Sequence, residues 1–230
     1  MGFGYRFGPW NKVYWQSQFF DGLQHFPIFS ENQIRTKYAT KSSRNLFSWN
    51  FKQKSTENDL KIAFLEENFD YFENINRPKS SGGKANTFLV KEDFRYAISR
   101  NFSFNLLGEF QNIKGKGYQS GIHDAERSVF SAAGLLAYQP LESLFLEFGL
   151  KKEFIQNYQT PLLFSLGSRW QPTDFYTLKI NASRNFRTPS FNDLYWQPGG
   201  NLLLKPETSW QAEFSQEFKY KNFSTGNQSL

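Results

Sequence analysis

Cysteine is absent from the 230 residues, methionine occurs once and histidine occurs twice. Without cysteine the chain cannot form a disulfide scaffold, a zinc finger, an iron–sulfur site or a thiol nucleophile. The chain has no unbroken apolar run of about 18 residues, so no transmembrane helix is predicted. Its first ten residues, MGFGYRFGPW, lack a basic segment followed by an apolar core, so no signal peptide is predicted either.

Clusters of like charge are also lacking. The 27 Lys and Arg and the 21 Asp and Glu give a net charge of +6, and both signs are spread along the whole chain. A nucleic-acid-binding protein would more often gather its basic residues on one face or stripe. No nucleic-acid partner is therefore predicted.

Aromatic residues, in contrast, are abundant: 27 Phe, 11 Tyr and 6 Trp make up 19% of the chain. The mean hydropathy is nonetheless polar, at −0.62. Aromatic side chains favour a pleated, half-buried surface. Many rings on a polar background indicate sheets with one apolar and one solvated face.

Apolar residues recur at every second position through most of the chain. In residues 144–151 (LFLEFGLK) the even positions are apolar up to Leu150, and Glu147, Gly149 and Lys151 stand between them. A period of two places each set on one face of a strand, so the sequence predicts an all-β, antiparallel fold. The predicted strands are 31–40, 43–53, 58–72, 84–98, 102–112, 126–138, 143–157, 162–171, 175–186 and 208–220, with a further one considered within 12–20.

Segment 58–72 departs from this regularity. Phe69 and Tyr71 have the opposite parity to Leu60, Ile62 and Phe64. Such a switch is typical of a β-bulge or of a barrel rim.

The connections alternate in length. Short, turn-like links at 54–57, 99–101, 139–142 and 172–174 alternate with longer ones at 73–83, 113–125 and 187–207, with a compact link at 158–161 among the latter. Outer-membrane β-barrels have short turns at one end, long loops at the other, and strands of about ten residues with apolar-out, polar-in alternation. The pattern therefore favours a transmembrane β-barrel segment of 10–11 strands.

The alternate, polar positions of the predicted strands include charged residues near the middle of the strands. Unpaired ions in a small dry core would cost several kcal/mol each, so these side chains indicate a wide, wet or plugged lumen and hence a large barrel. The residues are Glu109, Glu147, Lys151, Arg169, Lys179, Glu213 and Glu217.

Residues 185–208, NFRTPSFNDLYWQPGGNLLLKPET, carry the most specific motif. It resembles the signature near the end of TonB-dependent receptor barrels, particularly the cobalamin-receptor type; Leu202 and Leu203 depart from the usual Pro-Asn. The matching residues are Phe186, Arg187, Pro189, Ser190, Phe191, Leu194, Tyr195, Asn201, Leu204, Lys205, Pro206 and Glu207.

The resemblance implies a barrel of 22 strands in the bacterial outer membrane, closed by a plug domain and energised by the TonB protein. It implies active uptake of a scarce nutrient such as a cobalamin or an iron chelate. On this interpretation residues 1–30 are a lead with at most one strand, 31–220 are a barrel segment, and 221–230 are a truncated tail. With no plug domain and no closing strands, the chain is expected to be a fragment that does not transport alone.

Within the motif, Arg187 occupies one of the alternate positions whose side chains are predicted to face inward. It is therefore expected to point into the lumen near the outer mouth of the barrel. Tyr195 and Trp196 follow, where amphipathic rings favour a membrane boundary or a ligand vestibule. A structural role in one external hairpin is the expectation for most of the motif. Arg187, Tyr195 and Trp196 are the candidates for direct ligand contact.

Enzyme sites find little support. His123, Asp124 and Glu126 lie in a predicted loop, but a metal site needs three or four convergent ligands. Ser190 has no histidine near it in sequence to activate it. No catalytic residue, cofactor site or metal site is predicted. Two alternatives to the receptor remain: a porin-like or structural barrel without energy coupling, and a soluble all-β glycan-binding module.

Overall fold

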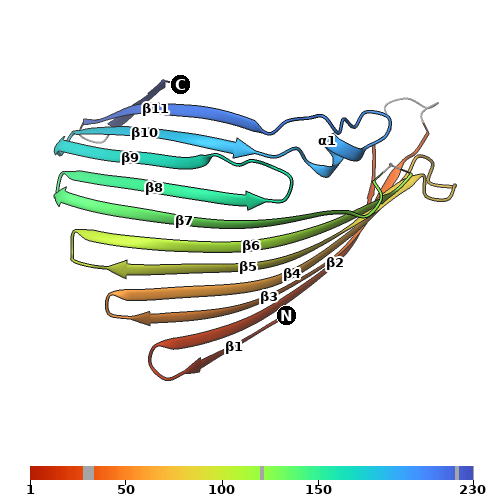
Figure 1. Ribbon diagram of the computed structural model, residues 1–230, viewed down its shortest axis with the longest axis horizontal. Coiled ribbons are helices and arrows are strands. Elements are labelled where there is room, and N and C mark those ends of the chain that lie inside the picture. The colour runs from red at the N-terminus through yellow and green to blue at the C-terminus, as the bar shows by residue number, and fades with distance from the viewer. Residues whose placement is uncertain (28–33, 120–121, 221–222, 230) are drawn as a thin grey trace.

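The computed structural model describes residues 1–27, 34–119, 122–220 and 223–229. Twelve strands form one antiparallel sheet in which every strand pairs with its neighbours in sequence (Figure 1). The prediction of an all-β antiparallel fold is confirmed. The strands are β1 (Gly2–Phe7), β2 (Asn11–His25), β3 (Lys37–Gln53), β4 (Thr56–Phe72), β5 (Ser81–Ala97), β6 (Phe102–Tyr118), β7 (Ala125–Leu141), β8 (Leu144–Ile155), β9 (Leu162–Thr173), β10 (Tyr176–Arg187), β11 (Glu207–Tyr220) and β12 (Phe223–Ser229).

The sheet is a single open layer. Over the described residues, β1 pairs only with β2 and β12 only with β11. No large side chain among these residues is fully buried, so the sheet has no hydrophobic core of the kind that holds a soluble sandwich together. No helix among the described residues is long and apolar enough to cross a membrane.

The two ends of the sheet differ as predicted. At one end, on the left in Figure 1, successive strands are joined by tight turns at 8–10, 54–55, 98–101, 142–143 and 174–175. At the other end lie the longer connections, including 188–206, which contains the short helix α1 (Phe191–Tyr195). We call these the short-turn end and the long-loop end.

One face of the sheet carries what we call the apolar belt. Near the short-turn end it begins with paired rings, among them Tyr96 with Phe104 and Phe102 with Tyr138, whose centroids are 5.7 and 6.0 Å apart. Farther along the strands it ends at a second row of rings, which includes Phe88, Phe110, Phe130 and Phe154. Most side chains between the two rows are aliphatic, for example Leu106, Leu136 and Leu166, and Glu92 of β5 lies on the same face.

The belt has the dimensions of a lipid-facing surface. From Phe102 to Phe110, at about 3.3 Å per residue, it covers about 26 Å along β6, which is about 20 Å along the membrane normal for a strand tilted by about 40°. Transmembrane barrels show an apolar band of about 25 Å bordered by aromatic girdles. Leu106, halfway between the girdles, is 53% exposed because no other part of the described chain covers it. This exposure is expected of a side chain that faces lipid.

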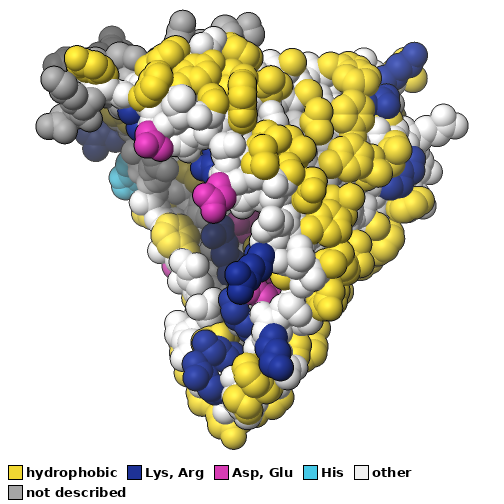
Figure 2. Space-filling view, turned by 90° about the vertical axis from the view of Figure 1, so that its left-hand side faces the viewer, with side chains coloured by type: hydrophobic (Ala, Val, Ile, Leu, Met, Phe, Trp, Pro, Cys, Tyr) yellow, Lys and Arg dark blue, Asp and Glu magenta, His cyan; other side chains and the backbone are white. Residues whose placement is uncertain are grey.

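The opposite face, which we call the charged face, carries the mid-strand charges predicted to point inward. The pairing register places Glu147, Asn181 and Glu213 in one row of this face and Arg169 beside Lys179 in another. In Figure 2, which looks at the short-turn end, blue and magenta side chains gather in the hollow at the middle of the view, and yellow side chains cover the wall to its right. The ion pairs on this face include Lys61–Asp59 (2.8 Å), Lys151–Glu153 (2.7 Å) and Lys179–Glu217 (3.8 Å).

The strands continue beyond the apolar belt, and the sequence prediction missed this continuation. β6 runs to Tyr118, although residues 113–118 were predicted to be loop. Lys114 and Lys116 lie on the face of the belt but past its edge, where Lys114 pairs with Glu126 at 3.3 Å. Beyond the lipid the outward residues are polar, so the hydrophobic alternation that predicted the strand disappears.

The loss of hydrophobic alternation past the belt also explains two further corrections to the predicted strands. The strands predicted at 31–40 and 43–53 are one strand, β3, in which Lys41 and Ser43 face outward past the belt; residues 31–33 lie outside the described residues. The bulge suspected in 58–72 is wrong, because β4 pairs with β3 and β5 without a register shift. Phe69 and Tyr71 instead face inward, past the edge of the belt.

Both ends of the chain also contribute more strands than expected. Residues 1–30 contain β1 and β2, where at most one strand was predicted. The segment 221–230, predicted to be a tail, contains β12, which pairs with β11.

Candidate functional site

The signature motif folds into a compact structure at the long-loop end, which we call the α1 loop (residues 188–206). Ser190 caps helix α1, and its side chain accepts a hydrogen bond from the Asp193 amide at 3.2 Å. The Asp193 carboxylate accepts in return from the Ser190 amide at 2.7 Å. This reciprocal arrangement satisfies two amides that a helix N-terminus otherwise leaves unpaired. The PSFND segment therefore defines where the helix begins.

Asp193 is the one acidic residue of the α1 loop. Hydrogen bonding from the Ser190 amide, then from the Ser190 hydroxyl, and the nearby Arg187 guanidinium lower the pKa of Asp193 below its usual value. Asp193 therefore stays ionised and can keep the cap closed through the physiological pH range.

The end of α1 is folded back by glycine. The Asn201 amide donates to the Asp193 carbonyl at 2.8 Å, which brings the chain leaving the helix against its first turn. A methyl group at Gly200 would lie 2.6 Å from the Trp196 carbonyl oxygen and 2.8 Å from that of Leu194. Only glycine allows this close backbone approach. Leu194 is the buried side chain of the helix, at 7% exposure.

The α1 loop lies against the charged face of the central strands. Phe191 covers Gly115 of β6, where a methyl group would come within 3.0 Å of the ring. The Arg127 guanidinium of β7 lies 5.1 Å from the Phe191 ring and 5.6 Å from the ring of Tyr158, in the β8–β9 connection. Arg127 also donates to the Thr188 hydroxyl at 3.1 Å. One arginine thus joins β7, the β8–β9 connection and the α1 loop.

Beside the helix the loop encloses a recess of about 210 Å³. Its walls bring both signs of charge together, because Arg187, Lys205, Asp193 and Glu207 all line it. Arg187 and Glu207 are also register partners at the ends of β10 and β11. A polar, charged recess of this size is suited to holding a polar group of a ligand rather than a whole apolar molecule.

Residues 1–228 match the family described as "TonB dependent receptor-like, beta-barrel". The chain belongs to this family. Its members are proteins of the bacterial outer membrane, and the long-loop end is accordingly the outer end.

Similarity to individual proteins is local in sequence and extensive in structure. The chain is 42% identical over 50 residues to the vitamin B12 transporter BtuB of Vibrio vulnificus, a match that covers 22% of this chain and 8% of that protein. It superposes on the siderophore receptor PirA of Pseudomonas aeruginosa with a TM-score of 0.77 at 12% identity, covering 97% of this chain and 42% of PirA. The Serratia marcescens hemophore receptor HasR gives a TM-score of 0.73 at 12% identity, covering 96% of this chain and 42% of HasR. The chain therefore spans less than half the length of these receptors.

The structure brings the predicted signature residues together, but in two groups. Ser190, Leu194 and Asn201 build the helix and its return, whereas Arg187, Lys205 and Glu207 line the recess. The remaining signature residues are Phe186 at the end of β10, Phe191 and Tyr195 in α1, Pro206 before β11, and Leu204 and the buried Pro189, which also line the recess. Tyr195 and Trp196 are 36% and 48% exposed. Their contact with a ligand stays a prediction.

Sequence reasoning missed the residues that receive the loop, namely Gly115, Arg127 and Tyr158. They lie on other strands and connections, and nothing in the local pattern marks them. Near His123, Asp124 and Glu126 form ion pairs with Lys116 and Lys114 at 3.6 and 3.3 Å. Within the described ranges, no three acidic or histidine side chains converge as metal ligands would.

Gly200→Ala should loosen the α1 loop, because its methyl group meets backbone atoms that cannot move aside. We expect a cost of about 1–3 kcal/mol, as for overpacking. Gly199→Ala is the matched control: its methyl group would meet only the exposed Trp196 ring, 2.7 Å away, which can rotate. Hydrogen exchange of the amides at 194–201 would measure the difference. Equal protection in the two variants would contradict the assignment.

Proposed function

We propose that the intact protein is an outer-membrane receptor that binds a scarce nutrient, a cobalamin or an iron-carrying chelate, and admits it actively. The described sheet would supply about half of the barrel wall. Support comes from the family and from the names of its similar proteins, which include a vitamin B12 transporter and a siderophore receptor. The wall itself performs no chemistry in this proposal.

The observation that carries the proposal is the α1 loop held over the charged face at the outer end. Arg187 and Lys205 border a recess there, and the rings of Tyr195 and Trp196 are exposed on the same loop. Metal chelates and corrinoids present anionic or polar groups next to flat ring surfaces. Cations placed beside exposed rings can bind both kinds of group at once.

The charged face supports a large polar partner inside the barrel. Its ion pairs are half exposed, for example Lys61–Asp59 with 44% and 34% of each side chain accessible. Such a surface suits a plug domain with solvent in the gaps better than a dry core. In this proposal the TonB protein pulls on the plug from the periplasm, and the nutrient passes along the charged face. Residues 1–230 alone would leave two unpaired sheet edges and would transport nothing.

Nutrient binding to the receptor tests this proposal. Arg187→Gln should weaken binding of cyanocobalamin or of a ferric catecholate by about tenfold or more, the value of one charge-assisted hydrogen bond. Arg169→Gln is the matched control, because Arg169 lies on the same face near the short-turn end. Quenching of tryptophan fluorescence by either nutrient gives the affinity. Unchanged affinity in Arg187→Gln would refute the ligand role of the recess, and absence of binding by either probe would refute the nutrient class.

A further inference from the structure

An apolar recess of about 400 Å³ lies on the charged face, where strands β6 to β10 contribute to its lining. Leu107, Ala133 and Leu163 share one row of the pairing register, and Leu135 lies in the next row toward the short-turn end. Leu163 is 9% exposed. Pockets of about 300–1,000 Å³ with mostly apolar walls are typical binding sites for small molecules. Leucines gathered on a face that is otherwise polar therefore call for an occupant.

Glycine at position 149 shapes the floor of this apolar recess. A methyl group at Gly149 would lie 2.5 Å from the Ser165 hydroxyl and 3.1 Å from a methyl group of Leu135. Both neighbouring side chains thus lean over β8 at this point. The Leu135 side chain reaches across β8 toward β9, so the apolar surface continues from β7 to Leu163.

The charges at the apolar recess are paired with each other. Lys151 stands between Ala133 and Leu163 in the same row, but its ammonium binds the Glu153 carboxylate at 2.7 Å. The methylene stem of a lysine packs well against apolar groups while its charged end lies elsewhere. Since Glu153 neutralises Lys151, the recess favours an apolar group over an ion.

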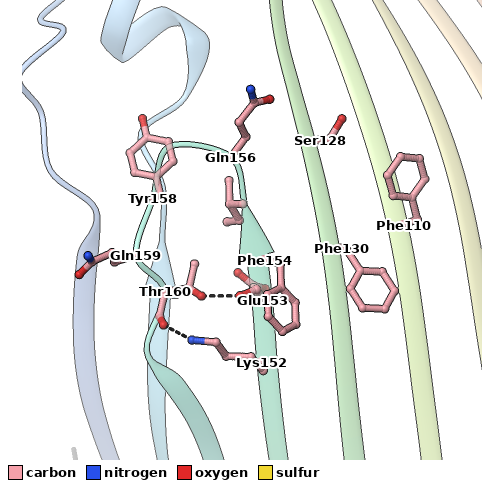
Figure 3. Close-up of a pocket in the computed structure, with 11 residues that line it drawn as sticks. Phe110, Ser128, Phe130, Lys152, Glu153, Phe154, Gln156, Tyr158, Gln159 and Thr160 are labelled. Atoms are coloured by element: carbon pink, nitrogen blue, oxygen red, sulfur yellow. Dashed lines mark hydrogen bonds between the residues drawn. The ribbon is translucent and has the colours of Figure 1, made fainter.

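The wall of the apolar recess is held in place by the β8–β9 connection (residues 156–161). Figure 3 shows how the connection is fixed to β8: the Lys152 ammonium donates to the Thr160 carbonyl, and the Thr160 hydroxyl donates to the Glu153 carbonyl. β9 begins two residues after Thr160, at Leu162. These two hydrogen bonds therefore fix the start of β9 and the position of Leu163.

The apolar recess adjoins the charged recess beside Arg187. Asn185 lines the apolar recess, and Arg187, the next inward-facing residue of β10, lines the charged one. Two residues of a strand span about 7 Å. A single small molecule can therefore place one group in each recess.

We propose that the apolar recess binds an aliphatic arm of the nutrient whose anionic head is held beside Arg187 and Lys205. This inference rests on the proposed function and narrows it: the nutrient is an iron chelate that carries an acyl or alkyl chain. Each methylene group buried against Leu107, Leu135 and Leu163 should raise the affinity about fourfold when it is fully removed from water. A uniformly polar chelate would leave these leucines unused.

Two ferric catecholates that differ in one amide, octanoyl in one and acetyl in the other, test this inference. The intact receptor in lipid nanodiscs should bind the octanoyl compound about tenfold or more tightly, because part of the gain from burying six methylenes is lost in ordering the chain. Quenching of tryptophan fluorescence gives both affinities, and their ratio is the readout.

Neighbouring alanines of β7 supply the variant and its control. Ala133→Phe fills the apolar recess and should bring the affinity ratio to about one. Ala132→Phe places the same ring on the lipid side of the same strand, where Ala132 is the register partner of Gly108, and should keep the ratio. Ala133→Asn makes the floor polar without filling it and should lower the ratio to about threefold, which decides the matter if Ala133→Phe does not fold.

The possible failures separate this inference from the proposed function. Equal affinity of the unchanged receptor for the two chelates would overturn the inference alone, and would indicate that another part of the receptor, such as the plug, fills the recess. An unchanged ratio in both Ala133 variants would place the arm elsewhere, and a lost ratio in Ala132→Phe would assign the preference to the lipid. Binding of cyanocobalamin but of neither chelate would also overturn the inference alone. Absence of binding by all three probes would refute the proposed function as well.

Discussion

Replacing Leu106 by arginine should prevent stable insertion of the protein into lipid. Leu106 lies midway between the two aromatic rows of the apolar belt and is 53% exposed. An arginine on the lipid face of a transmembrane barrel costs about 2–4 kcal/mol at the midplane and much less near the interfaces. Since a whole domain is stable by only about 5–15 kcal/mol, the loss should be plain in a urea titration in phospholipid vesicles.

The neighbouring residue provides the control. Leu107 points to the charged face, where it is the register partner of Asp93 on β5. Leu107→Arg should therefore cost far less, because the new cation meets water and a carboxylate. If the two variants unfold at the same urea concentration, the assignment of the lipid-facing side is wrong. The assignment of the charged face to the inside of the barrel would then be wrong as well.

The sequence predicted the fold well wherever lipid constrains it. Between the aromatic rows most outward residues are apolar, with Glu92 as an exception, so the period of two is clear and strands such as 162–171 were located within two residues of their bounds. Past the belt that constraint ends. There the sequence pattern of Lys114, Gly115 and Lys116 predicted a loop, although these residues extend β6. Phe69 faces inward, and no bulge is needed to place it there.

The candidate site was predictable only in its local part. Ser190 and Asp193 lie three residues apart, so both residues of the helix cap belong to one short segment of the sequence. The surface that receives the helix is assembled from β6, β7 and the β8–β9 connection, more than thirty residues away along the chain at the nearest. Periodicity assigns Arg127 to the charged face, but it cannot show which ring will cover it.

Removing Arg127 should release the α1 loop from the wall. Its guanidinium interacts with the rings of Phe191 and Tyr158 and donates to Thr188. Each cation–π contact contributes about 0.5–2 kcal/mol and the hydrogen bond about 1 kcal/mol, so Arg127→Ala should cost about 2–5 kcal/mol locally. The open form of the loop would then rise by about 30-fold or more in population.

Limited proteolysis within residues 196–204, compared between variants, measures that opening. Arg127→Lys keeps the charge but loses the planar stacking surface, so we expect it to open nearly as much as Arg127→Ala. Arg95→Ala removes an arginine of the same face at the short-turn end, where its partner is Glu57 at 4.0 Å, and should leave the loop closed. If Arg127→Lys instead behaves as the unchanged protein, charge alone holds the loop, and the contacts with the two rings contribute little. Because the recess beside Arg187 is built by the same loop, nutrient affinity should fall in parallel with the opening in every variant of this series.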